Sequence, residues 1–522
     1  MSRKTLLVLG STAAVVALPL LDPLTRARVL NGVLFQQGVW IVVGALLILT
    51  LCWGIVVLEE RSSRLKPSQK SAEAVDAAEP APTAAGTTDP TGRTERVWVP
   101  FAAAAAIVVM AVAGYFLQQW DRHTTLRDTV AIADVPVPAM GMRAPYLVAE
   151  RQASSNLSGT VGNIGETDYL PASDTYSTLV NRPGPLNPGY EAIVSQQLAL
   201  TGNADSTMCR FSEQADQRMG GFLWNSLERG IAAHDFMLIA KEKDAWGYCD
   251  GDTPMVVVPL TKLHTWLSPV DVPAGVAVYN GGDGVLEVRD SVEAGALPGP
   301  VVSISHAERI NASLATFGGT WWSSLIGQSG LTDQPKDEDD TNISNASNFS
   351  LAVGPDKLQG FVSPFTSRAS SRTIDHVGVV DSSRVAAGNH AGASLHTLAT
   401  PRQSNAATAD GIKSTYASMP GWAAGMAVME IVPGGGEEVW QASIGQKQNV
   451  NYRVELLADG TSCLLTATGT KLSCSDGEGT TEAVGGTGTP IDADADPSEL
   501  TDEQLVELHE AVVEEIHRRL AG

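Results

Sequence analysis

Three long apolar runs occupy the first 120 residues of this 522-residue chain, and no comparable run follows them. The runs cover Leu6–Leu21, Val39–Leu58 and Val97–Phe116. A helix of about 20 apolar residues can cross the hydrocarbon core of a bilayer, because it satisfies its backbone hydrogen bonds internally. The runs therefore predict three membrane-spanning helices that anchor one large water-exposed region. For Leu6–Leu21, which is short and follows a basic start, a cleaved signal peptide is the alternative.

Basic residues near the runs predict the orientation of the chain. Lysine and arginine beside membrane-spanning helices concentrate on the cytoplasmic side. The most basic segment lies between the second and third runs and contains Arg61, Arg64, Lys66, Lys70, Arg93 and Arg96. This pattern places the N-terminus and residues 59–96 in the cytoplasm and residues 121–522 outside it, in a multi-pass protein of the cell membrane.

Charge is divided unevenly between the two parts of the chain. Residues 1–120 carry 10 basic and 8 acidic residues, whereas the remainder carries 25 basic and 50 acidic ones, for a total net charge of −23. A surface this acidic repels the phosphate backbone of nucleic acids. The charge therefore argues against a nucleic-acid-binding protein.

A short sequence pattern occurs twice in the outer region. MGGFLWNSL at 219–227 and FGGTWWSSL at 317–325 both fit G-G-x-x-W-x-S-L, at an offset of 98 residues. Farther along, Phe236–Leu238 matches Phe349–Leu351 at an offset of 113. One polar insertion in the second copy explains the change of offset, since insertions are tolerated in surface loops. The sequence therefore predicts a duplicated unit.

Each copy is expected to be a helix followed by antiparallel strands. In the first copy, apolar residues recur at helical spacing from Phe211 to Ile231. Trp224 and Trp322 occupy equivalent positions in the two copies, and the core is their expected location. A ligand-binding aromatic pair in a cleft between the copies is the alternative.

Five cysteines agree with this topology. Cys52 lies in the second apolar run, where it is expected to act as a small apolar side chain. The other four fall in the outer region, and an even number in an oxidising compartment predicts two disulfides. We favour Cys209–Cys249 and Cys463–Cys474, because the second copy lacks counterparts of both Cys209 and Cys249. Four free buried cysteines are the alternative.

The predicted fold class is a membrane-anchored α+β protein with three transmembrane helices, a duplicated helix-plus-antiparallel-sheet unit and a C-terminal β-rich module. Within an otherwise irregular lead-in, Tyr190–Leu200 is the one expected helix. The predicted segments, in order, are a transmembrane hairpin (1–58), a disordered cytoplasmic linker (59–96), a third transmembrane helix (97–120), the lead-in (121–204), two α+β repeats (205–298 and 299–405), the β-rich module (406–480), a linker (481–500) and an amphipathic helix (501–522).

The β-rich module is predicted strand by strand. Apolar residues alternate or cluster in short runs that turn residues separate. The expected strands are Met426–Ile431, Val439–Ile444, Tyr452–Leu457, Cys463–Ala467 and Lys471–Cys474.

Few residues suggest chemistry. His376, His390, His396 and Asp381 are candidate metal ligands, because imidazoles and carboxylates bind zinc, but their spacing fits no metal motif. Structural or surface histidines are the favoured interpretation.

The sequence also lacks the G-x-S-x-G elbow that would support a hydrolytic triad on the serines at 382–383. The acidic residues at 492–503 resemble a calcium loop but have Pro497 where glycine is required. We therefore predict no cofactor and no bound metal.

The sequence matches no family motif and carries no catalytic signature. The favoured function is a non-enzymatic binding or scaffold component of a cell-envelope or membrane complex. An extracytoplasmic, metal-dependent hydrolase or transferase is the alternative, and a solute sensor is a weaker one. The expected partners are the lipid bilayer, membrane or envelope proteins, and further copies of the chain.

Overall fold

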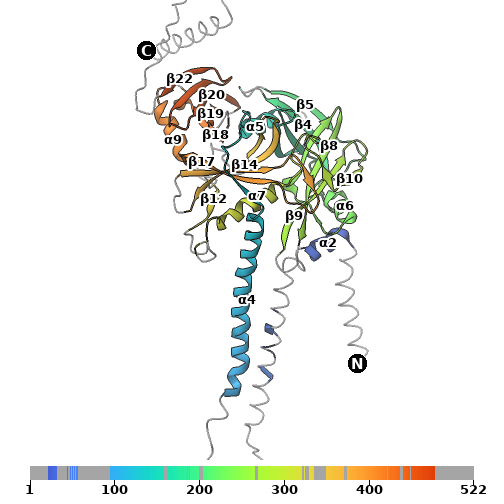
Figure 1. Cartoon of the computed structure of the whole chain (residues 1–522). Coiled ribbons are helices and arrows are strands. Elements are labelled where there is room, and N and C mark those ends of the chain that lie inside the picture. Colours follow the sequence, from blue (N-terminus) through green and yellow to red (C-terminus); the bar gives the residue numbers. More distant parts are fainter. Residues whose placement is uncertain are drawn as a thin grey trace, which may run out of the picture. The chain divides into compact units, whose positions relative to one another are not determined.

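The computed structural model describes residues 22–31, isolated positions between 44 and 56, and residues 95–475 apart from short gaps, of which 334–348 is the longest. The chain divides into two compact units, Met1–Gly477 and Glu478–Gly522, and the described residues belong to the first. Strands make up 42% and helices 27% of the structure (Figure 1). The protein is therefore mostly β-sheet, and the predicted α+β class is wrong.

A four-stranded meander follows the first helices. Its order is β2-β3-β4-β5, and every neighbouring pair is antiparallel. The segment predicted to be irregular thus contains most of a sheet, and the helix predicted at Tyr190–Leu200 is strand β4. The elements are α2 (Pro23–Arg28), α4 (Glu95–Arg127), β1 (Val130–Ala133), α5 (Tyr146–Asn156), β2 (Asn163–Leu170), β3 (Thr175–Asn181), β4 (Tyr190–Leu198) and β5 (Ala204–Arg210).

The next sheet has the order β10-β9-β8-β6, and β7 also pairs with β8. Its two long strands are almost continuously buried, as their runs of valine require. The elements are η4 (Leu223–Asn225), α6 (Leu227–His234), β6 (Leu238–Ile239), η5 (Glu242–Asp244), β7 (Trp246–Asp250), β8 (Thr253–His264), β9 (Val270–Asn280) and β10 (Leu286–Arg289).

A six-stranded sheet has the order β1-β17-β15-β14-β12, and β13 also pairs with β14. Strand β1 runs parallel to β17, whereas β11 and β16 form a separate two-stranded ladder. The elements are β11 (Ser291–Val292), α7 (Ile304–Ser313), η6 (Leu314–Thr316), β12 (Leu331–Asp333), β13 (Phe349–Val353), β14 (Leu358–Ser367), β15 (Thr373–Asp381), β16 (Val385–Ala386) and β17 (Ala393–Gln403).

The last sheet is the antiparallel meander β18-β19-β20-β21-β22. All five strands predicted for this part of the chain are confirmed, with boundaries shifted by at most a few residues. The elements are α9 (Asn405–Thr415), η7 (Trp422–Ala424), β18 (Ala427–Pro433), β19 (Trp440–Gln446), β20 (Asn449–Leu456), β21 (Ser462–Thr466) and β22 (Lys471–Ser475).

The helix predicted around the first G-G-x-x-W-x-S-L motif is wrong. Residues 211–226 form turns and the short 3-10 helix η4, and α6 begins only at Leu227. The backbone there is held by distant tyrosines, since the amides of Gln217 and Met219 donate to the hydroxyls of Tyr279 and Tyr190. These contacts place the apolar residues in the core without helical geometry.

The strand equivalences predicted from the 113-residue offset are also wrong. Phe236–Leu238 leads into β6, whereas Phe349–Leu351 lies in β13, which corresponds by connectivity to β7. The two sheets do share one hairpin pattern. In β8–β9, Pro259 lies opposite Val276, and in β14–β15, Pro364 lies opposite Val377. The ladder register shifts directly after Pro259 in the first hairpin and one residue after Pro364, following Phe365, in the second.

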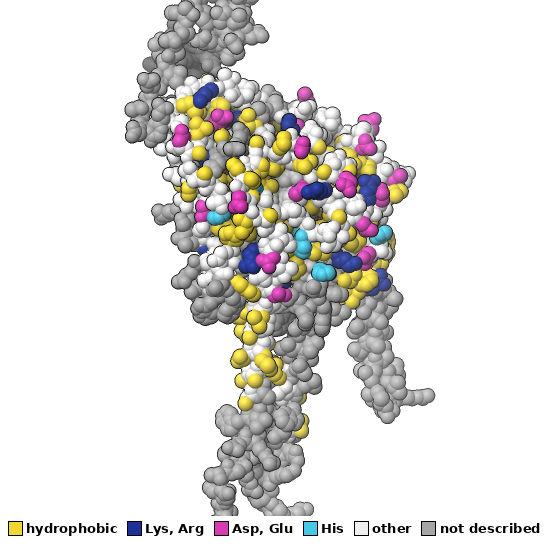
Figure 2. Space-filling view, in the orientation of Figure 1, with side chains coloured by type: hydrophobic (Ala, Val, Ile, Leu, Met, Phe, Trp, Pro, Cys, Tyr) yellow, Lys and Arg dark blue, Asp and Glu magenta, His cyan; other side chains and the backbone are white. Residues whose placement is uncertain are grey.

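The prediction of three membrane-spanning helices is contradicted. Among the residues that the structure describes, no helix combines the length and the apolar character needed to cross a bilayer. The third run lies in α4, whose exposed large apolar side chains extend from Val108 to Leu117 (Figure 2). Gln118, Gln119 and Asp121 follow, and the end of the helix packs on α7 and η6. Leu6–Leu21 lies outside the described residues, and only isolated positions of Val39–Leu58 fall within them.

Several other predictions also fall outside the described residues. These are residues 59–94 of the linker predicted at 59–96, the linker at 481–500, the C-terminal helix at 501–522, the acidic segment at 492–503 and Trp322.

Candidate functional site

A cavity of about 410 Å³ lies where β17 ends, between α9, β18–β19 and the turn that joins β20 to β21. Four residues of α9 face it, namely Thr408, Gly411, Ile412 and Thr415. Their spacing of three and four residues places them on one side of the helix. The helix begins where it does because the Ser404 side chain accepts a hydrogen bond from the Ala407 amide and caps it.

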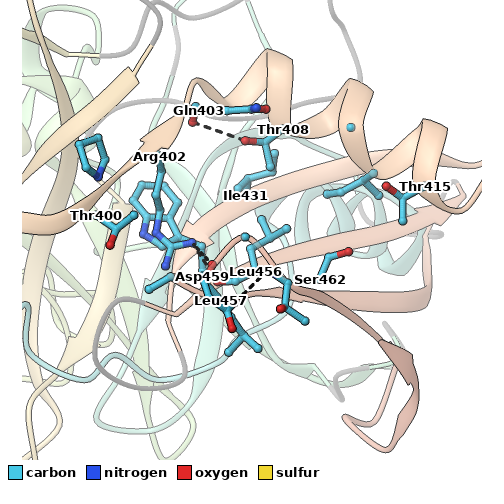
Figure 3. A pocket seen from close by; sticks show the side chains of 17 residues that line it. Thr400, Arg402, Gln403, Thr408, Thr415, Ile431, Leu456, Leu457, Asp459 and Ser462 are labelled. Carbon is cyan, nitrogen blue, oxygen red and sulfur yellow. Dashed lines mark hydrogen bonds between the residues drawn. The ribbon is translucent and has the colours of Figure 1, made fainter. Parts of the chain in front are cut away.

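The floor of the cavity is apolar. Ile412, Ile431, Trp440 and Leu456 line it from α9, β18, β19 and β20 (Figure 3). Ile412, Ile431 and Trp440 are at most 2% exposed and belong to one continuous core. The floor therefore rests on rigid structure.

Arg402 brings a positive charge to this floor. Its Nη1 donates to the carbonyl oxygens of Leu456, at 2.9 Å, and Leu457, at 3.3 Å. Figure 3 shows the side chain extending from β17 toward the end of β20. The guanidinium carbon also lies 6.0 Å from the ring centroid of Trp440. These contacts fix where the charge sits, because guanidinium groups bind carbonyls and aromatic faces with defined geometry.

Asp459 places a negative charge at the rim. Its carboxylate accepts a hydrogen bond of 2.9 Å from the Thr461 amide in the tight turn between β20 and β21. Hydrogen bonding by Thr461, with a smaller contribution from the charge of Arg402, lowers the pKa of Asp459. The carboxylate is therefore ionised at neutral pH, and the cavity contains one cation and one anion.

The described residues that line the cavity include no histidine, cysteine, lysine or glutamate. Ser462 is buried, and its hydroxyl lies 3.0 Å from the Tyr416 hydroxyl and 2.7 Å from that of Ser475. A nucleophilic serine needs a base within hydrogen-bond reach, and none of these lining residues supplies one. The arrangement suits reversible binding.

The structure does not bring the three predicted histidines together. His376 Nδ1 lies 2.8 Å from Asp375, whereas the ring of His396 lies between the Ser394 hydroxyl and the Val135 carbonyl. Asp381 accepts hydrogen bonds from Ser383 and Arg384. Within the described part of the chain, no three histidine, cysteine, aspartate or glutamate side chains are placed to hold a metal.

His390 instead lies beside a histidine that the sequence did not single out. The rings of His390 and His306 are nearly parallel, with centroids 6.0 Å apart. His306 in α7 is fully buried, and burial together with nearby positive charge lowers its pKa to about 3. It is therefore neutral at physiological pH.

The serines at 382 and 383 have structural roles. Ser382 donates to the Gln359 carbonyl, and Ser383 donates to Asp381. Neither contact involves a histidine, so the geometry offers no triad here.

Both predicted disulfides are confirmed. Cys209 of β5 is bonded to Cys249 of β7, which joins two sheets, and Cys463 is bonded to Cys474 between β21 and β22. Cys52 is free and exposed.

Trp224 was expected in the core, but its side chain is 71% exposed. The Arg229 guanidinium lies 4.8 Å from its ring centroid.

Sequence reasoning missed the cavity itself. Its residues span 400–462 and cross the domain boundary predicted at 405. One signal was available, since Asp459 and Gly460 form a turn between two correctly predicted strands. Arg402 gave no signal, because its position depends on carbonyls 54 and 55 residues away.

Comparisons with protein-family models, curated proteins and solved structures yield no match to this chain. The predicted function was an integral membrane scaffold, with an extracytoplasmic hydrolase, transferase or sensor as alternatives. That prediction is wrong in its premise, because no helix in the described residues can span a membrane and no relative supports any of these roles.

Proposed function

We propose that this protein binds a small zwitterion with apolar side chains, of amino-acid or dipeptide size, in the cavity at the end of β17. The carrying observation is that Arg402 and Asp459 place opposite charges beside an apolar floor. The cavity volume of about 410 Å³ falls within the range of about 300–1,000 Å³ in which small molecules bind.

Charge favours a zwitterion over an anion. The chain carries a net charge of −23, so an anionic ligand is repelled at long range, whereas a zwitterion is not. A ligand carboxylate would face Arg402 and a ligand ammonium would face Asp459. The ligand's apolar side chains would lie on this floor, and the surface removed from water would be mainly their own and that of the partly buried Leu456, because Ile412 and Ile431 are already buried.

Calorimetric titration of the full chain with L-leucine and L-leucyl-L-leucine tests this proposal. We expect the free dipeptide to bind, and its methyl ester and N-acetyl derivatives to bind about tenfold or more weakly. Each derivative lacks one charge, and a charged hydrogen bond contributes about 1.5–3 kcal/mol.

Two variants assign the charges. Arg402→Met should weaken binding of the free acid but leave the methyl ester unchanged, which also shows that the cavity is intact. Asp459→Asn should weaken binding of the free amine but leave the N-acetyl form unchanged. Arg384→Met is the matched control, because Arg384 is 70% exposed and lies outside the cavity. Equal loss for the acid and the ester, or no binding of any zwitterion, would refute the proposal.

A further inference from the structure

A second surface stands apart from the cavity. Phe222, Leu223 and Trp224 are 49%, 53% and 71% exposed, and we call these three residues the apolar tip. The residues on either side are buried, since Met219 is 1% and Leu227 is 0% exposed. Three adjacent large apolar side chains held in water cost free energy, so an exposed group of this kind marks a contact surface.

The tip is built on a closed, hydrogen-bonded loop. The amides of Arg218 and Leu227 donate to the carbonyls of Asn225 and Arg218, both at 2.9 Å, and close its base. The Asn225 amide donates to the Phe222 carbonyl at 3.0 Å across the tip itself. Leu223 has a φ of 47°, a left-handed conformation that is unfavourable for a bulky residue. The loop therefore presents the tip rigidly.

An apolar hollow adjoins the tip along α6. Its volume is about 230 Å³, and most of its lining is apolar (Leu24, Ala27, Ile231, Ala232, Leu238, Ile239 and Ala240), with Arg28, Asn31 and Glu228 forming the polar part. The hollow lies between α2, α6 and β6. Figure 2 shows hydrophobic side chains beside basic ones at this end of the molecule. The same helix thus carries Arg229 against the tip and Ile231 into the hollow.

Charged side chains around the tip and the hollow form ion pairs with one another. Arg28 lies 2.6 Å from Glu228, and Arg229 forms an ion pair with Asp22. The surface therefore offers apolar side chains with paired charges between them. It suits a partner that is apolar within and carries both charges at its surface.

We propose that the apolar tip and the α2–α6 hollow dock on the surface of a phospholipid bilayer with zwitterionic headgroups. Tryptophan and phenylalanine settle at the boundary between headgroups and acyl chains. Within the loop, the carbonyls of Phe222 and Leu223 accept hydrogen bonds from the amides of Asn225 and Ser226, which lowers the cost of shallow insertion into a bilayer. Docking of this kind requires no helix that crosses the bilayer.

Flotation of the full chain with phosphatidylcholine vesicles tests the proposal. Replacing the three tip residues by serine should lower the vesicle partition coefficient at least tenfold, and Trp224→Ala alone about threefold to tenfold. Leu24→Ser, at the hollow, should lower it by a smaller factor. Leu472→Ser on β22 is the matched control, because Leu472 is 45% exposed but lies in a different sheet and should leave partitioning unchanged.

The lipid headgroup separates this mechanism from electrostatic attraction. Because the chain is strongly acidic, vesicles that contain phosphatidylglycerol should bind it less at low salt, and added salt should reduce the difference. Unchanged partitioning of the triple serine variant would overturn the proposal, as would stronger binding to anionic vesicles. A co-purifying protein that is lost with the triple variant, while vesicle partitioning is unchanged, would assign the tip to a protein partner instead.

Discussion

Two seams join the β2–β5 sheet to its neighbours. One is a buried ion pair, and the other is a disulfide bond. At the first, which we call the ion-pair seam, Arg143 meets Glu430 of β18 through two hydrogen bonds of 2.9 Å. Both side chains are almost fully buried, at 1% and 2% exposed. At the second, which we call the disulfide seam, Cys209 and Cys249 link β5 to β7.

The ion-pair seam connects several distant strands through one side chain. Arg143 also donates to the carbonyl of Ser350 in β13 at 3.2 Å and to the hydroxyl of Tyr176 in β3 at 3.3 Å. Its guanidinium carbon lies 4.4 Å from the ring centroid of Tyr146. Burial favours the neutral form, but the charge of Glu430 outweighs it and raises the pKa of Arg143. Burial raises the pKa of Glu430, and the charge and hydrogen bonds of Arg143 oppose that rise. The two hydrogen bonds of 2.9 Å fit an ionised pair.

A second carboxyl group, that of Asp168 in β2, lies near two other acidic side chains. Burial, together with the charges of Glu166 and Asp244, raises the pKa of Asp168 in β2 to about 8. At neutral pH this carboxyl group is mostly protonated. The comparison teaches that the protein pairs one buried carboxyl group, Glu430 of β18, with a cation and keeps another, Asp168 of β2, protonated, so the two groups should respond to different perturbations.

The largest expected effect comes from breaking the buried ion pair. Arg143→Met leaves Glu430 buried without its partner and should lower the free energy of unfolding by about 3–5 kcal/mol. Arg143→Met with Glu430→Leu removes both charges and should recover most of that loss. Urea unfolding followed by circular dichroism measures both variants.

The control for this pair is an exposed one. Arg384 lies 3.0 Å from Asp381 and is 70% exposed. Arg384→Met should change the free energy of unfolding by less than about 1 kcal/mol, because water screens surface pairs. If the double variant at the ion-pair seam is no more stable than Arg143→Met alone, then an unpaired buried charge is not what destabilises the single variant.

The β18–β22 meander and residues 211–226 differ in how far the sequence could predict them. The β18–β22 meander was predicted strand by strand, because each strand pairs with its sequence neighbour and local alternation and turns specify it. Residues 211–226 looked helical, because Phe211, Ala215 and Met219 recur at helical spacing. In the structure all three are buried, but hydrogen bonds to distant strands hold their backbone. A periodic pattern reports burial, and distant contacts decide the conformation.

The candidate cavity was beyond prediction for the same reason. Arg402, Trp440 and Asp459 are unremarkable in sequence, and only the packing of α9 against β18–β21 brings them together. The even number of cysteines in one region predicted two disulfides. The pairing of Cys209 with Cys249 is correct, although it was argued from a repeat whose strand equivalences the structure overturns. The buried ion pair was not, since Arg143 and Glu430 are 287 residues apart.

The next largest effect should come from the disulfide seam. Replacing both Cys209 and Cys249 by serine should lower the free energy of unfolding by about 2–4 kcal/mol, because the bond restricts the unfolded chain. The matched comparison is replacement of Cys463 and Cys474. The first bond closes 40 residues and the second 11, so the first pair should matter more by about 1 kcal/mol. Thermal unfolding with and without reductant measures both. Equal losses would show that loop length does not set the difference.

The last prediction concerns the buried carboxyl group of Asp168 and how it makes the free energy of unfolding depend on pH. Because the folded pKa of Asp168 is raised to about 8 from an ordinary value of 3.8, its contribution to stability is full below about pH 4 and is lost as pH rises toward 8. Asp168→Asn cannot ionise, so its free energy of unfolding should rise relative to that of the wild type by about 1.4 kcal/mol for each pH unit between about pH 5 and pH 8. Urea unfolding across this range, on a background that keeps the Arg143–Glu430 pair, measures the effect. If Asp168→Asn were destabilised equally at pH 5 and pH 8, Asp168 would contribute to stability through packing and not through its protonation.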